Sequence, residues 1–511
     1  MEAEAGPLAA SEPLLSARAN SHPSEALAEA RRLLRLALPS SATGVLAFCA
    51  RLITTAQVGR LSGTALSALS LGQTLYNITG LSIVVGVCSA IATLVGHADG
   101  ASEAALKGVI LQRGAAVGLA VSLLPLAAWS QAARLLHLLG QPDVISRGAA
   151  AYIHTAAPAL LLSALNYSLS DYLSAQRVLR PLVLVSGVTT ALTPALNDAF
   201  IRRAGWGATG AGASLVGLQA AELVLLVAVV AWHNARQPPG LKPWAGLSPA
   251  SALAGWGPYL ALALPCMAMM VLDWWAFEAL TLLAGLLPDA EVAVGAMGVC
   301  FGLHVVVFLA IAGIATAVCT RVSNELGAGR PDAARRAVVV GTVLGLAATV
   351  AATAPMWCLP GRVAAVFTSD PEVAGVVAST LPCLLVALLG DAVGSVLSGA
   401  IRGAGRQALG GWVNFMVFWV IGLPTAATAG LWAGWGTRGL WGAMAGASFL
   451  QAGVFVAVVA QLDWDAEARR SKHLVRSQST SGGGGGLGNR GGSAGSGGGS
   501  EAVAPLLDCA G

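Results

Sequence analysis

Three carboxylic acids lie inside segments of this sequence that are otherwise apolar, and they are the residues best placed to do chemistry. Asp273 and Glu278 fall within an apolar run from about residue 259 to 287, and Asp391 falls within another from about 373 to 399. Each run exceeds the roughly 20 apolar residues that cross a bilayer as a helix. A charge at that depth costs about 3 kcal/mol or more, so a functional role is the first hypothesis. Because apolar surroundings favour the neutral form of a carboxyl group, such an acid can take up and release a proton.

Each acid also has a structural interpretation, as a neutral group hydrogen-bonded to a neighbouring helix. The position of the acids near the middle of two long runs favours function. Glu278 follows Asp273 by five residues, about 140° further round a helix of about 3.6 residues per turn, so the two cannot share a face. We therefore expect Asp273 to face a cavity and bind a proton, and Glu278 to hold its helix to a neighbour.

Aromatic and imidazole groups accompany these acids. Trp274, Trp275 and Phe277 lie between Asp273 and Glu278 and could contact a substrate, or could simply pack. His154 and His304 lie in apolar runs and could relay protons, although we favour ordinary hydrogen-bonded packing for both.

Composition and motifs exclude several functional classes. Of the 511 residues 56% are hydrophobic and 11% charged, whereas soluble proteins carry about 25% charged residues. The net charge of +4 gives no indication of a nucleic-acid partner. No nucleophile–base motif, C-x-x-C or zinc-ligand spacing occurs, so the sequence predicts neither an enzyme nor a metal or cofactor site. It predicts an integral membrane protein.

Apolar runs divide the chain into five regions. We expect a disordered cytosolic tail at 1–35, a first lobe at 36–232, a linker at 233–258, a second lobe at 259–461 and a Gly/Ser-rich cytosolic tail at 462–511. Each lobe holds six runs, so the fold class is all-α, with twelve transmembrane helices. The runs cover about 36–57, 66–95, 109–129, 148–175, 181–201, 208–232, 259–287, 292–322, 335–358, 373–399, 409–431 and 438–461.

The basic residues set the orientation. The two tails and the loops after even-numbered runs hold 21 of the 29 Lys and Arg residues. Short loops rich in Lys and Arg stay in the cytosol, so both chain ends are expected there.

Short strings recur along the chain in the same order. Leu-Ala-Leu-Pro begins at residues 36 and 262, Ile-Ala-Thr begins at 91 and 314, and Pro158 answers Pro382. Six such pairs lie 223 to 234 residues apart. Because each half has an even number of spans, the two halves form a parallel, pseudo-symmetric repeat.

The repeat does not extend to the acids. By the nearest offsets, Asp273, Glu278 and Asp391 correspond to about Ala47, Leu52 and Tyr167. The coupling chemistry is therefore expected in the second half, and Glu222 is the best candidate in the first.

Several strings resemble a known family. The longest is Arg321-Val322-Ser323-Asn324-Glu325-Leu326-Gly327-Ala328-Gly329-Arg330-Pro331; others are Leu272-Asp273-Trp274-Trp275, Leu397-Ser398-Gly399 with Arg402-Gly403-Ala404-Gly405, and Gln57-Val58-Gly59-Arg60-Leu61. Over about residues 31–470 the chain resembles a MATE (multidrug and toxic compound extrusion) transporter of the plant-type detoxification branch. Asp273 stands where the family usually has Glu.

Two details of these strings carry structural expectations. The longest string is typical of a corner between two helices, with Gly327 ending one in the left-handed conformation and Pro331 starting the next. The segment Gly96-His97-Ala98-Asp99-Gly100-Ala101 departs from the family pattern and would place His97 and Asp99 in a cytosolic loop.

The resemblance implies two six-helix lobes around a central cavity and export of small organic molecules or xenobiotics in exchange for a cation. We expect H⁺, with Na⁺ as the alternative. Asp273 and Asp391 would couple the ion, and Asn414, beside Asp391 in the resemblance, could donate a hydrogen bond to a carboxylate. A monomer in the plasma, vacuolar or another endomembrane is expected. The alternatives are a flippase for lipid-linked substrates, which needs a cationic groove, and a scaffold or sensor without transport.

Overall fold

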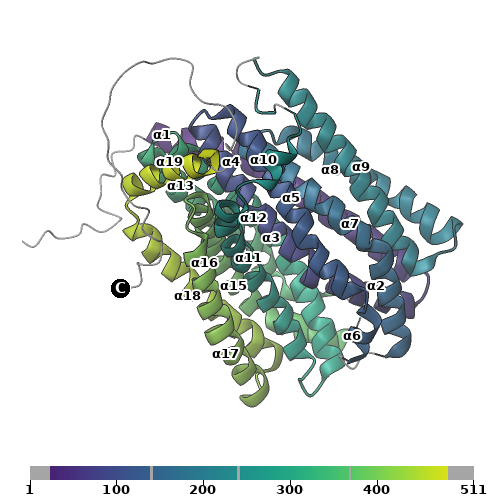
Figure 1. The fold of residues 1–511 in the computed structure, drawn as a ribbon. Helices are drawn as coiled ribbons and strands as arrows, with labels where there is room; N and C mark the ends of the chain where they lie inside the picture. Colours follow the sequence, from purple (N-terminus) through teal and green to yellow (C-terminus); the bar gives the residue numbers. More distant parts are fainter. Residues whose placement is uncertain (1–22, 139–141, 239–241, 245, 368–369, 481–511) are drawn as a thin grey trace, which may run out of the picture.

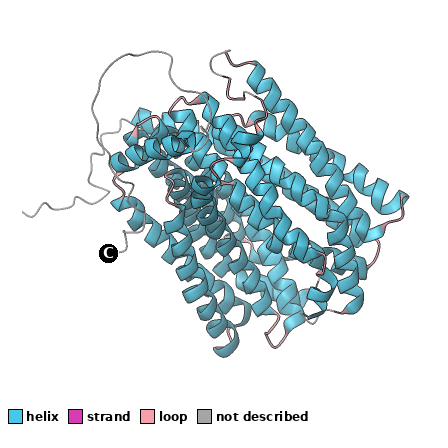
Figure 2. Cartoon of the chain, viewed as in Figure 1, coloured by secondary structure: helices cyan, strands magenta, loops and turns pink. Residues whose placement is uncertain are grey.

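The computed structural model describes residues 23–138, 142–238, 242–244, 246–367 and 370–480, and every regular element in that part of the chain is a helix (Figure 2). Eleven helical segments are long and apolar enough to cross a membrane. The other span of the expected twelve is α8 (Arg180–Asn197), continued by the π-helix η2 (Asp198–Arg203). It is less apolar because its polar side chains bind the first helix: the amide of Asn197 donates to Gln57 at 2.7 Å.

The N-lobe contains the first six spans (Figure 1). Its second span is built from four consecutive pieces, and a short helix, α6 (Ala132–Leu138), follows the third. The spans are α1 (Pro23–Gly59), α2 (Gly63–Tyr76) with η1 (Asn77–Leu81), α3 (Ser82–Cys88) and α4 (Ala90–Gly100), α5 (Ala104–Trp129), α7 (Asp143–Ala175), α8 with η2, and α9 (Gly207–Ala235).

The C-lobe repeats this order after the short helix α10 (Pro249–Leu253). Again a short helix, α14 (Pro360–Phe367), follows the third span of the lobe. The spans are α11 (Trp256–Ala284), α12 (Ala290–Gly327), α13 (Pro331–Cys358), α15 (Pro371–Gly403), α16 (Gln407–Asn414) with η4 (Phe415–Gly422), α17 (Leu423–Ala427) and η5 (Thr428–Trp432), and α18 (Gly436–Gln461).

Backbone turns confirm the repeat at the level of single residues. Positive φ angles occur at Ser102 and Gly329, at Arg177 and Gly405, and at the two Gly-Trp-Gly corners, 205–207 and 434–436. Each pair is separated by 227 to 229 residues. The sites of left-handed backbone therefore recur between the lobes even where the residue type does not.

Both tails are more ordered than expected. Helix α1 begins at Pro23, so residues 23–35, expected in a disordered tail, are helical, and Leu33 is fully buried. The expected C-terminal tail starts with another helix, α19 (Trp464–Thr480). The missed signal is amphipathic: Glu467, Ser471 and Val475 recur at helical spacing and are buried. The rest of the two tails lies outside the described residues.

Helix α19 lies across both lobes at one end of the bundle, in yellow at the upper left of Figure 1. Its Glu467 accepts two hydrogen bonds from the guanidinium of Arg406, on the C-lobe side, at 2.6 and 2.9 Å. On the N-lobe side the fully buried Arg113 of α5 donates to Gln478. We call this end, where α1 begins and α4 and α12 finish, the basic end; the opposite one is the far end.

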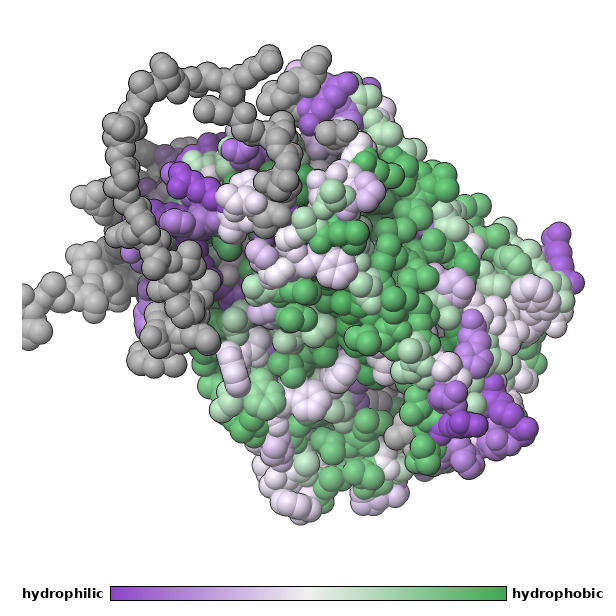
Figure 3. Space-filling model, in the orientation of Figure 1, coloured by the Kyte–Doolittle hydropathy of each residue, from purple (hydrophilic) through white to green (hydrophobic). Residues whose placement is uncertain are grey.

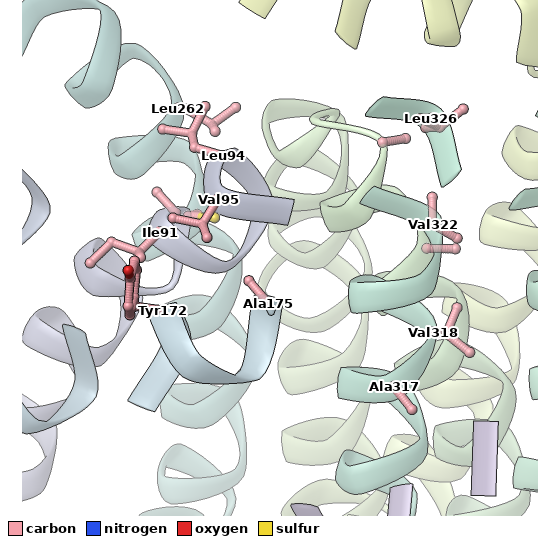
Figure 4. Packing of buried hydrophobic residues seen from close by; sticks show 14 of the residues in the cluster. Ile91, Leu94, Val95, Tyr172, Ala175, Leu262, Ala317, Val318, Val322 and Leu326 are labelled. Carbon is pink, nitrogen blue, oxygen red and sulfur yellow. The ribbon is translucent and has the colours of Figure 1, made fainter. Parts of the chain in front are cut away.

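The lobes share a core only toward the basic end. One buried apolar cluster joins residues of α4, α7, α11 and α12, ten of which are labelled in Figure 4. Two further clusters belong to one lobe each and include Leu69 and Trp129 in the N-lobe, and Leu280 and Trp441 in the C-lobe. Among the described residues, hydrogen bonds between the lobes run from the basic end to about mid-bundle, where Trp275 donates to Ser82 at 3.4 Å. This conformation is therefore closed at the basic end.

The basic end is sealed by polar contacts as well. Asn324 donates to Gly96 O at 3.0 Å and to Ala175 O at 3.2 Å, and Nε2 of the fully buried His97 lies 2.9 Å from Gly403 O. The expectation that His97 and Asp99 lie in a loop is wrong, because both belong to α4.

The corner after α12 is close to expectation. Helix α12 ends at Gly327 and Pro331 begins α13, as expected. The left-handed residue, however, is Gly329, with φ 69°, rather than Gly327. Gly327 is needed for a different reason: a Cβ there would collide with the backbone of His97 across the lobe boundary.

The outer surface suits a bilayer. In Figure 3 apolar side chains cover the middle of the visible face, and polar side chains gather toward the two ends. The chain is an integral, multi-pass membrane protein.

Candidate functional site

The acid predicted in the tenth span makes a buried contact with a histidine. Oδ2 of Asp391, in α15, lies 2.7 Å from Nε2 of His304, in α12, and both residues are 4% exposed. Close helix packing makes this contact possible, since a Cβ at Gly390 would lie 2.9 Å from the backbone of α18 and one at Gly399 would meet the backbone of α12. The expectation that glycines let α15 approach its neighbours is confirmed.

Aromatic rings surround the imidazole of His304. Phe277 of α11 is nearest, with ring centroids 4.8 Å apart, followed by Trp441 at 5.6 Å and Phe308 at 5.7 Å. The indole of Trp441 is itself anchored, since its Nε1 donates to Met297 Sδ at 3.2 Å. Phe277, predicted to contact substrate, therefore packs against the histidine.

Asp273 occupies the middle of α11 and is only partly buried. In the described part of the chain its carboxylate has no hydrogen-bond donor, but it lies within electrostatic range of Asp391 and of Arg402. The structure thus brings two of the three predicted acids together. Asp273 has the properties expected of a group that meets protons or substrate from an aqueous space.

Asn414 holds helices together instead of contacting a carboxylate. Its Nδ2 donates to Met269 O in α11 at 2.8 Å, and its Oδ1 accepts from Gln451 of α18 at 2.8 Å. A second tie, from Trp419 Nε1 to Leu272 O at 2.9 Å, fixes the turn of α11 that carries Asp273. Asn414 therefore positions α11 next to α16 and α18.

The remaining predicted residues diverge. Trp274 is 40% exposed, whereas Trp275 reaches Ser82 of the N-lobe. Glu278 is partly buried, and among the described residues no hydrogen bond or ion pair joins it to a neighbouring helix. The interpretation of Glu278 as a tether between helices is therefore not supported by the contacts.

The N-lobe has its own group of charged residues. Glu222 of α9, Asp171 of α7 and Arg51 of α1 all lie within electrostatic range of Tyr167. Next to them Asn166 donates to the side chain of Gln219 at 2.6 Å. In contrast with the acids of the C-lobe, these acids have a basic residue, Arg51, in their own group.

Sequence reasoning missed three residues of this region. His304 was interpreted as ordinary packing, but its partner is a carboxylate; His154, by comparison, lies 2.9 Å from the carbonyl of Trp129, as expected for ordinary packing. Arg402 acts electrostatically on Asp171 in one lobe and Asp273 in the other. Gln451 carries no sequence signal beyond being polar in an apolar run.

Comparison with known proteins agrees with this arrangement. The family model MatE matches two segments, residues 21–197 and 265–428, one in each lobe. Protein DETOXIFICATION 52 of Arabidopsis thaliana is 30% identical over 450 residues, 88% of each chain, and multidrug and toxin extrusion protein 2 of Oryctolagus cuniculus is 32% identical over 447 residues, 87% of this chain and 73% of the relative.

A solved structure extends the likeness to the fold. The crystal structure of the eukaryotic MATE transporter AtDTX14 aligns with a TM-score of 0.83 at 27% identity, covering 88% of this chain and 99% of that one. Twelve membrane-crossing helices in two lobes, a matching family model over both lobes and relatives of nearly full length establish the assignment, so the protein is a transporter and not an enzyme. The chain belongs to the MATE family of multidrug and toxin extrusion transporters.

Proposed function

We propose that this protein exports small organic molecules in exchange for protons, and that Asp391, His304 and Asp273 carry the coupling. The observation that supports this most is the buried contact between Asp391 and His304, halfway along their helices. Beside it lies a second acid without a hydrogen-bond donor among the described residues.

The Asp391–His304 contact can persist in two protonation states. With Asp391 ionised, the Nε2–H of His304 donates to Oδ2. With Asp391 protonated, its O–H donates to an unprotonated Nε2. Because neither state leaves a buried polar group unpaired, the pair can gain or lose a proton at low cost.

Asp273 supplies the link to substrate. As a partly exposed carboxylate it can hold a cationic molecule, and as a neutral acid it holds that molecule less well. Protonation of Asp273 or Asp391 therefore favours release, and a bound cation favours loss of the proton. Such differential affinity is what exchange between two conformations requires.

The direction of exchange follows from the closed end. The rule that basic loops stay in the cytosol places the basic end there. With that end sealed by Asn324, His97 and the shared apolar cluster, the site communicates with the far, non-cytosolic side. Proton uptake from that side, followed by opening of the basic end, completes one half of the cycle.

The charges oppose the flippase alternative. A phosphate-bearing substrate needs a cationic groove, whereas the mid-membrane groups named above include four acids, Asp171, Glu222, Asp273 and Asp391, against Arg51 and Arg402. An organic cation fits this balance better than a phosphate.

The test is transport by the purified protein in sealed proteoliposomes, with a pH gradient and a Na⁺ gradient imposed separately. Uptake of a fluorescent organic cation should follow the pH gradient and disappear when a protonophore collapses it. Uptake driven by Na⁺ alone would refute proton coupling, and uptake driven by neither gradient for any cation tried would support the non-transporting alternative.

A further inference from the structure

Five arginines from both lobes line one cavity at the basic end. Arg32 and Arg35 come from α1, Arg177 from the turn between α7 and α8, Arg321 from the last turns of α12, and Arg330 from the turn before α13. We call this cavity, of about 400 Å³, the arginine pocket. It is separate from the mid-membrane site, because all five residues lie at helix ends or in turns.

The acids next to the arginine pocket neutralise only part of its charge. Buried Arg321 binds Glu29 through Nε at 2.8 Å and Glu325 through Nη1 at 2.5 Å. The same two glutamates also serve Arg32, at 3.3 Å, and Arg330, at 2.6 Å. Three arginines thus share two carboxylates.

The other two arginines add further positive charge. Arg177 binds Asp99, but Lys107 neutralises the same carboxylate at 2.9 Å. Arg35 is exposed, and no carboxylate of the described chain lies within ion-pair distance of it. The arginine pocket therefore has cationic side chains to offer to a ligand.

The backbone at Arg177 indicates that this side chain is needed where it is. Its φ is 64°, a left-handed conformation that costs a residue with a Cβ about 1 kcal/mol. At the equivalent turn of the C-lobe the residue is Gly405, with φ 76°, which adopts the conformation freely. An arginine kept in a strained position, pointing into a cationic cavity, favours a binding role.

We infer that the arginine pocket binds a ligand with clustered phosphate groups, such as the headgroup of a phosphorylated inositol lipid or a soluble polyphosphate. Guanidinium groups match phosphate oxygens in geometry and charge. Basic pockets between helices at the cytosolic membrane surface are suited to such headgroups. Because the lining comes from both lobes, the ligand also stabilises the conformation closed at the basic end. This inference does not depend on the transported substrate or ion.

Binding to the full-length purified protein tests the inference without transport. Inositol trisphosphate and pyrophosphate are titrated against protein in detergent, and protein in phosphatidylcholine nanodiscs is compared with and without phosphatidylinositol bisphosphate. Saturable binding, with a thermal unfolding midpoint that rises with ligand concentration, is expected. Binding of the soluble probes identifies a polyphosphate as sufficient, and a response to the lipid alone identifies a membrane-inserted headgroup.

Matched variants separate the arginine pocket from general surface charge. Arg35→Gln removes an exposed side chain outside any ion pair and should weaken binding about fivefold. Arg177→Gly should weaken it similarly while relieving the strained turn. Arg336→Gln removes the same charge from an exposed position at the start of α13, outside the pocket, and should leave affinity unchanged. Equal losses in Arg35→Gln and Arg336→Gln, or no saturable binding of any probe, would overturn the inference.

Discussion

The two lobes place the same kinds of helix around the middle of the membrane but give them different side chains. In the C-lobe, α15 carries Asp391 against His304. In the N-lobe, the offset between Pro158 and Pro382 assigns Tyr167 of α7 to the place of Asp391, and the place of His304 falls in the π segment η1. Tyr167 lies among Glu222, Asp171 and Arg51.

This difference separates what a repeat duplicates from what function requires. The turns and close helix approaches recur because backbone geometry is set by packing, which both lobes must satisfy. The acid–histidine contact occurs once, because a single proton-exchanging group is enough to bias one equilibrium between two conformations. The N-lobe, whose charged group includes both signs, then has less need to change protonation.

Asp391→Asn should produce the largest effect. The amide keeps the size of the side chain and a hydrogen bond to His304 but cannot exchange a proton. We expect proton-driven uptake in proteoliposomes to fall by at least about tenfold, which corresponds to about 1.4 kcal/mol of lost coupling. Unchanged melting would show that the fold is intact. A variant that transports at the normal rate with the normal pH dependence would remove Asp391 from the mechanism.

Asp273 should show a similar loss with a distinct recovery. Asp273→Asn should reduce uptake by about tenfold. Asp273→Glu should keep transport, because a carboxylate remains and α11 is held in place by Asn414 and Trp419. The measurement is the pH profile of uptake for both variants side by side. If Asp273→Glu is as inactive as Asp273→Asn, the position depends on side-chain length rather than on a titratable group.

The N-lobe counterpart should respond weakly. Glu222→Gln removes one acid from a group that also contains Arg51, and we expect uptake to change by only about twofold, or about 0.5 kcal/mol. The comparison with Asp391→Asn in the same vesicle preparation is the informative one. A tenfold loss in Glu222→Gln would show that both lobes take part in coupling.

Glu278→Gln should have the smallest effect. The described structure gives this side chain no partner on another helix, so both stability and coupling should change by no more than about 0.5 kcal/mol. Thermal melting in detergent and the pH profile of uptake report the two properties separately. Uncoupled transport in Glu278→Gln with normal transport in Asp273→Asn would exchange the roles assigned to the two acids.

Several features of the site could be predicted from the sequence because their physical cause is local. A carboxyl group inside a run of apolar residues is costly wherever its helix packs, so Asp273 and Asp391 stand out without any knowledge of their neighbours. His304 has no such signature: a histidine in a span is compatible with a carbonyl partner, as for His154, or with a carboxylate, and the two cannot be told apart along the chain.

The sequence by itself determined the number of spans, the repeat and the family, because span length is set by bilayer thickness and the repeat is written in residue order. Only the tertiary structure decided which groups meet. Arg321 binds Glu29, 292 residues away, and His97 reaches Gly403, 306 residues away. Such contacts depend on how twelve helices pack, and residues that look alike in sequence then acquire different partners. For the same reason, five arginines that appeared only as markers of a cytosolic face form a single pocket.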